Sequence, residues 1–142
     1  MNKEEIMKCI PHRKDMLILD EATVEGGSAR GKYLVRGTEF FLNEHYPQKR
    51  IVPGTILCEI MAQLLAVCVS QRTRGMPVLA KIEEASFKKM VLPGDNLDIY
   101  VETLSKSTRV IPANCEIKVL DEVCASAKLT VASLISETFD VF

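Results

Sequence analysis

The hydrophobic and polar positions along this chain follow two different periods, separated by a polar break at residues 72–77. Before the break lies the most apolar run, residues 55–69, whose only strongly polar side chains are Thr55, Glu59 and Gln63. These three are four residues apart, and at about 3.6 residues per turn each step drifts by only about 40°. The run therefore predicts a helix with one narrow polar stripe, buried on nearly all other sides.

The start of this helix is marked by Pro53. Proline suits the first helical position because its φ is fixed and its missing N–H is not needed there. A membrane-spanning helix is the competing interpretation. The apolar run is shorter than the roughly 20 residues that a span needs, and Glu59 and Gln63 interrupt it. We therefore expect a helix in the core of a globular domain.

A carboxylate on such a helix requires an explanation, because burial disfavours its charged form. Glu59 has two interpretations. Either backbone or side-chain donors hold it and it serves structure only, or it belongs to a functional site. The spacing alone leaves both interpretations open.

After the break the pattern alternates with a period of two, which is typical of strands with one buried face. Residues 78–87 form the first candidate strand. Leu97, Ile99 and Val101 alternate with polar neighbours in the second. The alternation continues in two further segments, and turn signals separate neighbouring segments, so we expect antiparallel strands. The two further segments are residues 115–119 and 123–131, and the turns lie at 93–96 and 121–122. In the second of these segments we expect Val123, Ala125 and the alternate residues after them on the buried face.

The first part of the chain is more mixed. Residues 2–9 predict a short helix that ends before Pro11. Residues 16–19 form a compact apolar run that predicts a buried strand. A turn signal at 25–28 and the following residues 29–36 predict the return strand of a hairpin.

Residues 37–52 show no clear period and predict a loop with one helical turn, which carries His45 to the start of the long helix. The expected architecture is α+β. A long central helix is wrapped by an antiparallel β-sheet, and residues 1–142 form one domain.

Composition narrows the function classes. With 142 residues and 47% hydrophobic content, the chain supports one substantial core. Its 18 basic and 19 acidic residues give a net charge of −1, which does not favour nucleic acid as a partner. Five cysteines form no C-x-x-C pair and no metal-ligand spacing, and the N-terminus lacks the apolar region of a signal peptide. We expect reduced thiols in a cytoplasmic protein.

Five short strings, in their order and spacing, carry a resemblance to a known family. They are Ile10-Pro11-His12-Arg13, His45-Tyr46-Pro47, Pro53-Gly54, Glu59-Ile60-Met61-Ala62-Gln63 and Leu92-Pro93-Gly94-Asp95. Over nearly its whole length the chain resembles the hot-dog-fold 3-hydroxyacyl-[acyl-carrier-protein] dehydratases of type II fatty acid synthesis, specifically the FabZ type. The carboxylate of Glu59 resembles the FabZ type, because the related dehydratase-isomerases usually have Asp at the matching position.

The resemblance implies dehydration of a (3R)-3-hydroxyacyl-acyl-carrier-protein to the trans-2-enoyl product. His45 matches the base that removes the C2 proton, a role that suits an imidazole. Glu59 matches the acid that handles the departing hydroxyl. The N–H of Gly54, at the positive end of the helix dipole, matches the oxyanion contact. The resemblance implies no cofactor and no metal.

The resemblance also implies partners. In this family the His and the Glu of one site come from different subunits, so we expect at least a homodimer, often assembled into a hexamer as a trimer of dimers. Ile56 and Ile60 are candidates for an acyl-chain tunnel, with plain core packing as the alternative. The acidic carrier protein predicts a basic docking patch.

Lys88 and Lys89 match the basic residues of the family, and Lys49 and Arg50 are further candidates. Ordinary solvated charge is the alternative for each of them. His12 occurs in a family string, and we expect it to be a structural residue near the first strand.

Several positions depart from the family pattern. Glu44 and Gln48 replace glycines on either side of the His-Tyr-Pro string, and Thr55 and Met90 replace the usual apolar residue and proline. Lys14-Asp15 replaces an aromatic-Pro pair. None of them removes a catalytic group. Two alternatives therefore stay open beside the dehydratase, a hot-dog acyl-thioesterase and a non-catalytic acyl-binding protein.

Overall fold

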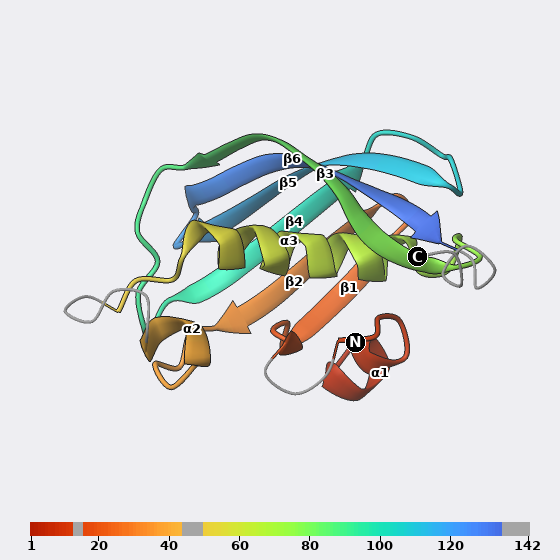
Figure 1. Ribbon diagram of the computed structural model, residues 1–142. Helices are drawn as coiled ribbons and strands as arrows, with labels where there is room; N and C mark the ends of the chain where they lie inside the picture. Colours follow the sequence, from red (N-terminus) through yellow and green to blue (C-terminus); the bar gives the residue numbers. More distant parts are fainter. Residues whose placement is uncertain (13–15, 44–49, 135–142) are drawn as a thin grey trace.

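A computed structural model describes residues 1–12, 16–43 and 50–134 of the chain. Its centre is helix α3 (Gly54–Val69), which lies across one face of a six-stranded sheet (Figure 1). The order of strands is β1-β2-β4-β5-β6-β3, and every neighbouring pair is antiparallel. This arrangement confirms the α+β architecture. The strands are β1 (Glu21–Glu25), β2 (Ser28–Leu34), β3 (Met76–Phe87), β4 (Asn96–Thr103), β5 (Val110–Val119) and β6 (Glu122–Leu134).

Helix α3 has the burial that its sequence pattern predicts. Every residue from 60 to 69 is buried, which fits a helix held between the sheet and the N-terminal segment. Pro53 is the N-cap residue, one position before the helix begins. Within the described residues, no helix is long and apolar enough to cross a membrane.

The alternating segments after the break are strands. Leu97, Ile99 and Val101 of β4 are buried and face the helix layer, as predicted. Strand β5 begins earlier than expected, at Val110. The expected inward position of Val123 is wrong: Cys124 is the buried residue, because the pairing of β5 with β6 shifts by one position next to Ile117.

The first hairpin is confirmed, with one correction. Its turn lies at Gly26-Gly27 between β1 and β2, but the first strand is β1, not residues 16–19. Leu17, Ile18 and Leu19 are buried as a strand would be. Their backbone groups, however, bond to side chains from two helices instead of a neighbouring strand.

Two short helices complete the fold. Helix α1 (Lys3–Met7) is shorter than the expected 2–9 and begins at a capping box formed by Asn2 and Glu5. Helix α2 (Phe40–Asn43) is the single helical turn expected between the hairpin and α3. It precedes the segment that carries His45, which lies outside the described residues.

One continuous hydrophobic core joins residues from Ile6 in α1 to Val131 in β6. All five cysteines are free thiols, and four of them are buried. Burial raises the pKa of the Cys115 thiol to about 12, so this group stays protonated and behaves as a small apolar side chain.

Candidate active site

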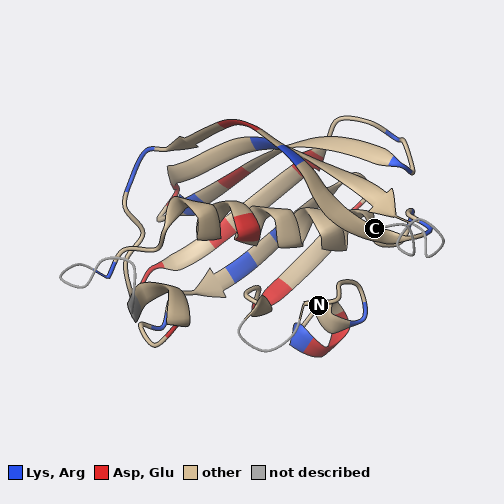
Figure 2. Ribbon diagram, viewed as in Figure 1, with Lys and Arg blue, Asp and Glu red and all other residues tan. Residues whose placement is uncertain are grey.

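The polar stripe of α3 changes character along the helix. Thr55 is exposed, the side chain of Glu59 is 26% exposed, and Gln63 is only 1% exposed. The stripe therefore sinks from the surface into the protein over two helical turns. Figure 2 shows a single acidic band in the middle of α3, with tan ribbon on both sides.

Both polar atoms of the buried Gln63 amide form hydrogen bonds to the backbone. Its Nε2 donates to the carbonyl of Met16, and its Oε1 accepts from the N–H of Ile18 at 3.0 Å. The side chain thereby takes the place of a strand partner for a buried, irregular segment. Gln63 is a structural residue.

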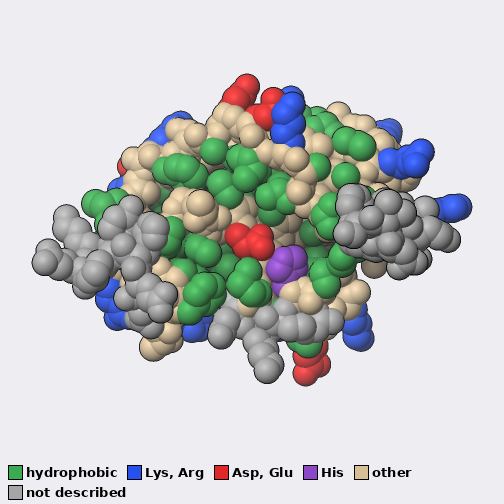
Figure 3. All heavy atoms as spheres, in the orientation of Figure 1, with side chains coloured by type: hydrophobic (Ala, Val, Ile, Leu, Met, Phe, Trp, Pro, Cys, Tyr) green, Lys and Arg blue, Asp and Glu red, His purple; other side chains and the backbone are tan. Residues whose placement is uncertain are grey.

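Glu59 meets a different kind of partner. Nε2 of His12 lies 3.3 Å from Oε1 of Glu59, and the histidine side chain is also 26% exposed. Figure 3 shows an acidic side chain beside a histidine in the middle of a largely hydrophobic face. The expectation that His12 lies near the first strand did not include this contact, because no local spacing connects a residue before β1 with one on α3.

Gly54 begins α3, and the first N–H groups of a helix have no intrahelical acceptor. A Cβ at this position would lie 3.0 Å from the ring of Phe87, so the ring packs directly over the glycine backbone. Half of the Phe87 side chain is nevertheless exposed. The helix start is therefore partly covered by a half-exposed aromatic ring.

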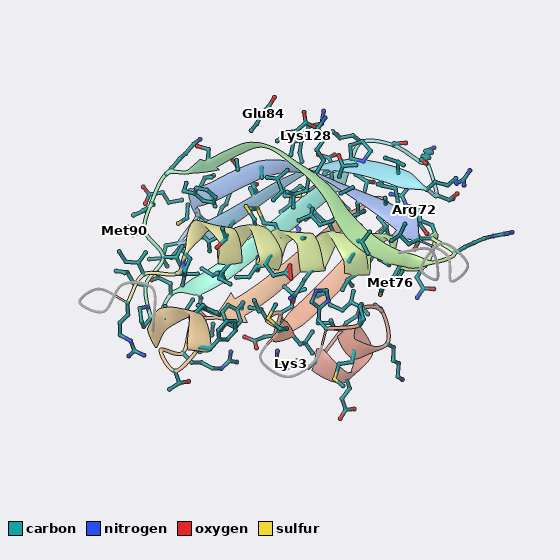
Figure 4. All side chains as sticks on the ribbon, in the orientation of Figure 1. Lys3, Arg72, Met76, Glu84, Met90 and Lys128 are labelled. Atoms are coloured by element: carbon teal, nitrogen blue, oxygen red, sulfur yellow. The ribbon has the colours of Figure 1, made fainter. Side chains whose placement is uncertain are left out.

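The two predicted docking lysines, Lys88 and Lys89, lie next to the start of α3. A surface pocket of about 340 Å³ is lined by Gly54, Phe87, Lys88 and Lys89 together with other residues around the end of β3. Lys89 forms an ion pair with Glu122, whose carboxylate raises the pKa of the ammonium group. In Figure 4, Met90 marks this amino end of α3 and Arg72 lies beyond its carboxyl end.

The remaining predicted site residues lie in the core, at the surface or outside the described residues. Ile60 is fully buried, and Ile56 is partly buried and packs against the core cluster. Arg50 is exposed. The predicted base His45 lies outside the described residues, as do Lys49, Glu44 and Gln48.

A second carboxylate fixes the chain just before α2. Glu39 accepts hydrogen bonds from the hydroxyl of Tyr33 and from the N–H groups of Arg36 and Gly37. Burial opposes ionisation of Glu39, but these donors outweigh it and lower its pKa. Burial and the neighbouring carboxylate raise the pKa of Tyr33. No helical or strand period connects the members of this network, so the sequence pattern does not predict it.

The described part of the chain offers no group of three His, Cys, Asp or Glu side chains that could hold a metal ion. Around α3, the described residues bring together one carboxylate, its histidine partner and the helix start. This set can hold or move a proton beside an apolar surface and can stabilise a developing negative charge.

Comparison with protein families gives a match to the FabA-like domain over residues 10–128. The chain is 39% identical over 130 residues to the 3-hydroxyacyl-[acyl-carrier-protein] dehydratase FabZ of Fusobacterium nucleatum, covering 89% of this chain and 92% of that protein. It is 33% identical over 137 residues to the FabZ dehydratase of Bacillus subtilis, covering 93% and 97% of the two chains.

Solved structures agree on the fold. The dehydratase heterocomplex ApeI:P from Xenorhabdus doucetiae aligns with a TM-score of 0.84 and 18% identity, covering 96% of this chain and 95% of that one. The Escherichia coli PaaI protein aligns with a TM-score of 0.66 and 16% identity, covering 91% and 90%. With the family match and the two near-full-length relatives, this chain belongs to the FabA-like hot-dog family, and within it to the FabZ-type 3-hydroxyacyl-[acyl-carrier-protein] dehydratases.

Proposed function

We propose that this chain removes water from a (3R)-3-hydroxyacyl group carried by acyl carrier protein and releases the trans-2-enoyl product, as a step of type II fatty acid synthesis. The observation that carries the proposal is the position of Glu59. It is the only charged residue of α3, and it lies beside His12 on a largely hydrophobic face, five residues from the start of the helix.

The reaction needs one base and one acid. His45 takes the proton from C2, the C2–H electron pair becomes the new C2=C3 bond, and the C3–O bond breaks. Glu59 gives its proton to the departing hydroxyl, which leaves as water. Return of the proton from His45 to Glu59 through solvent resets the site, so no oxidant, reductant or cofactor is consumed.

The thioester oxygen becomes negative as the C2 proton leaves, and the N–H of Gly54 stabilises it. Gly54 and Glu59 are five residues apart on one helix, which corresponds to about 7.5 Å along the axis. This separation accommodates a thioester oxygen at one end and a C3 hydroxyl at the other, each with its own hydrogen bond. Ile56, between them, is well placed to contact the acyl chain, and Ile60 supports the helix from the core.

The working unit is a homodimer in which His45 of the partner subunit approaches Glu59. Strand β3 supports this assembly because it is the last strand of the sheet and exposes Leu79 and Ile82. An apolar terminal strand is a ready surface for a second copy. Lys88 and Lys89, beside the Gly54 pocket, dock the acidic carrier protein. Five free thiols favour a reducing compartment, the cytoplasm.

The direct test offers a 3-hydroxyacyl-carrier-protein to the purified protein and follows the enoyl product. We expect turnover that is lost in both His45→Ala and Glu59→Gln. Release of free thiol without enoyl product would favour the thioesterase alternative. Tight acyl binding with neither product would favour the non-catalytic alternative.

The shared site has its own test. His45→Ala and Glu59→Gln subunits, each inactive, are mixed and allowed to exchange. Random pairing gives heterodimers in which one of two sites has both native residues, so we expect recovery of about a quarter of the wild-type activity. Absence of recovery after demonstrated subunit exchange contradicts a site built from two subunits.

A further inference from the structure

The contact between His12 and Glu59 lies inside one subunit, whereas the proposed base comes from the other. His12 Nε2 and Glu59 Oε1 are 3.3 Å apart, and both side chains are partly exposed on the same apolar surface. No other residue of α3 carries a charge. The carboxylate of the proposed acid thus has one oxygen occupied by a neighbour from its own chain.

The position of His12 is set by anchors on both sides. Upstream, Ile10 is 3% exposed and its N–H donates to the carbonyl of Ile6 in α1. Downstream, Gln63 holds Met16 and Ile18 through two hydrogen bonds. The histidine is therefore delivered to α3 by a segment whose flanks are tied to the core, not by a free N-terminal tail.

Lys3 adds a further anchor. Its ammonium group donates to the carbonyl of Leu17 at 3.0 Å and to that of Leu19 at 2.8 Å, fixing the same segment from α1. A substitution of Lys3 therefore changes the support of His12 without removing a contact of the acid.

A glutamate that acts as a general acid must present one chosen oxygen to the substrate. Its terminal torsion is broad, so an untethered carboxyl group samples many orientations. A hydrogen bond to one oxygen removes that freedom and leaves the second oxygen in a defined direction. Small errors of placement cost large factors in rate.

We propose that His12 is a positioning residue for Glu59, and the proposal rests on the function proposed above. The Nε2–H of His12 donates to Oε1, and Oε2 carries the proton that is given to the C3 hydroxyl. His12 itself does not touch the substrate. The alternative is an ordinary partly exposed ion pair, which contributes little to stability and nothing to the rate.

The test measures kcat and KM for the wild type, His12→Ala, Glu59→Asp and the double variant, all as full-length protein. We expect His12→Ala to lower kcat by about 10- to 100-fold and to change KM by less than about twofold. Substrate binding is kept, but the carboxyl group of Glu59 is no longer held in its orientation. Glu59→Asp withdraws the carboxyl group from the imidazole. In that background the same His12 substitution should lower kcat by less than about twofold.

Two further variants separate positioning from folding. His12→Gln keeps an N–H donor at a similar reach and should restore most of the lost kcat. Lys3→Met loosens the anchor of His12 without touching Glu59, so it should lower kcat in the native background but not in Glu59→Asp. The ring nitrogen resonances of His12 should also shift in Glu59→Asp.

Turnover by the wild type with an unchanged kcat in His12→Ala overturns the positioning role alone. Equal losses in the native and Glu59→Asp backgrounds overturn it as well, because His12 would then act independently of Glu59. No enoyl product from the wild type overturns the proposed function and this inference together.

Discussion

Glu59 and Gln63 are one helical turn apart on the same stripe of α3, and the structure uses them in opposite ways. The amide of Gln63 is buried and bonds to two backbone groups, while the carboxyl group of Glu59 is partly exposed and meets a titratable side chain. Both satisfy the same sequence pattern. They differ in their contacts, because backbone groups reach Gln63 and an imidazole reaches Glu59.

The comparison separates stability from chemistry on one helix. The buried amide of Gln63 stabilises the fold, because its removal leaves backbone groups without a hydrogen-bond partner. A partly exposed carboxyl group beside an imidazole is suited to proton transfer. Substitutions at the two positions should therefore change different quantities.

The largest expected effect is on turnover. Glu59→Gln keeps the shape of the side chain and removes its transferable proton, so kcat for dehydration should fall by about 10²- to 10⁴-fold. The free energy of unfolding should change by less than about 1 kcal/mol, since the lost ion pair is partly exposed. Steady-state kinetics and urea unfolding give the two numbers. A large loss of stability would remove the contrast with Gln63.

The second effect is on stability. Gln63→Leu leaves the buried N–H of Ile18 and the carbonyl of Met16 without their partner, so unfolding should become easier by about 2–5 kcal/mol. At a temperature where the variant stays folded, kcat should drop far less than in Glu59→Gln. Chemical denaturation checks the first expectation. An unchanged midpoint would mean that water replaces the amide without cost.

A third effect sharpens the comparison at the start of the helix. In Gly54→Ala the new methyl group lies against the half-exposed Phe87 ring. Stability should change by less than about 1 kcal/mol, but the methyl group crowds the oxyanion position and should lower kcat about tenfold. Adding Phe87→Ala relieves the contact with the ring. If that double variant recovers full kcat, the ring and not the crowded backbone was the obstacle.

The smallest effect concerns a carboxylate used purely for structure. The pKa of Glu39 is lowered in the folded state, so its stabilisation is fully present above the unfolded value of about 4.5 and is lost as pH falls below it. Glu39→Gln should cost about 1 kcal/mol at pH 7. The difference between wild type and variant should shrink at acid pH. A difference that is constant from pH 7 to pH 3 would contradict a role for the charge.

Much of the fold follows from local pattern. The alternation of Leu97, Ile99 and Val101 predicted a strand with one buried face, and the run 55–69 predicted the central helix, because side-chain period directly reflects backbone geometry. The strand expected at 16–19 is wrong for a physical reason. A short apolar run indicates burial but not its hydrogen-bond partner, and here the partner is a glutamine side chain.

By itself, the sequence determined that a carboxylate and an amide share one stripe of a buried helix, and its motifs indicated the family that the comparisons confirm. It did not determine which groups each of the two side chains contacts. Only the tertiary structure decided this, by placing the backbone of 16–18 against Gln63 and the imidazole of His12 against Glu59. Such contacts join residues far apart in the chain, and no helical or strand period records them.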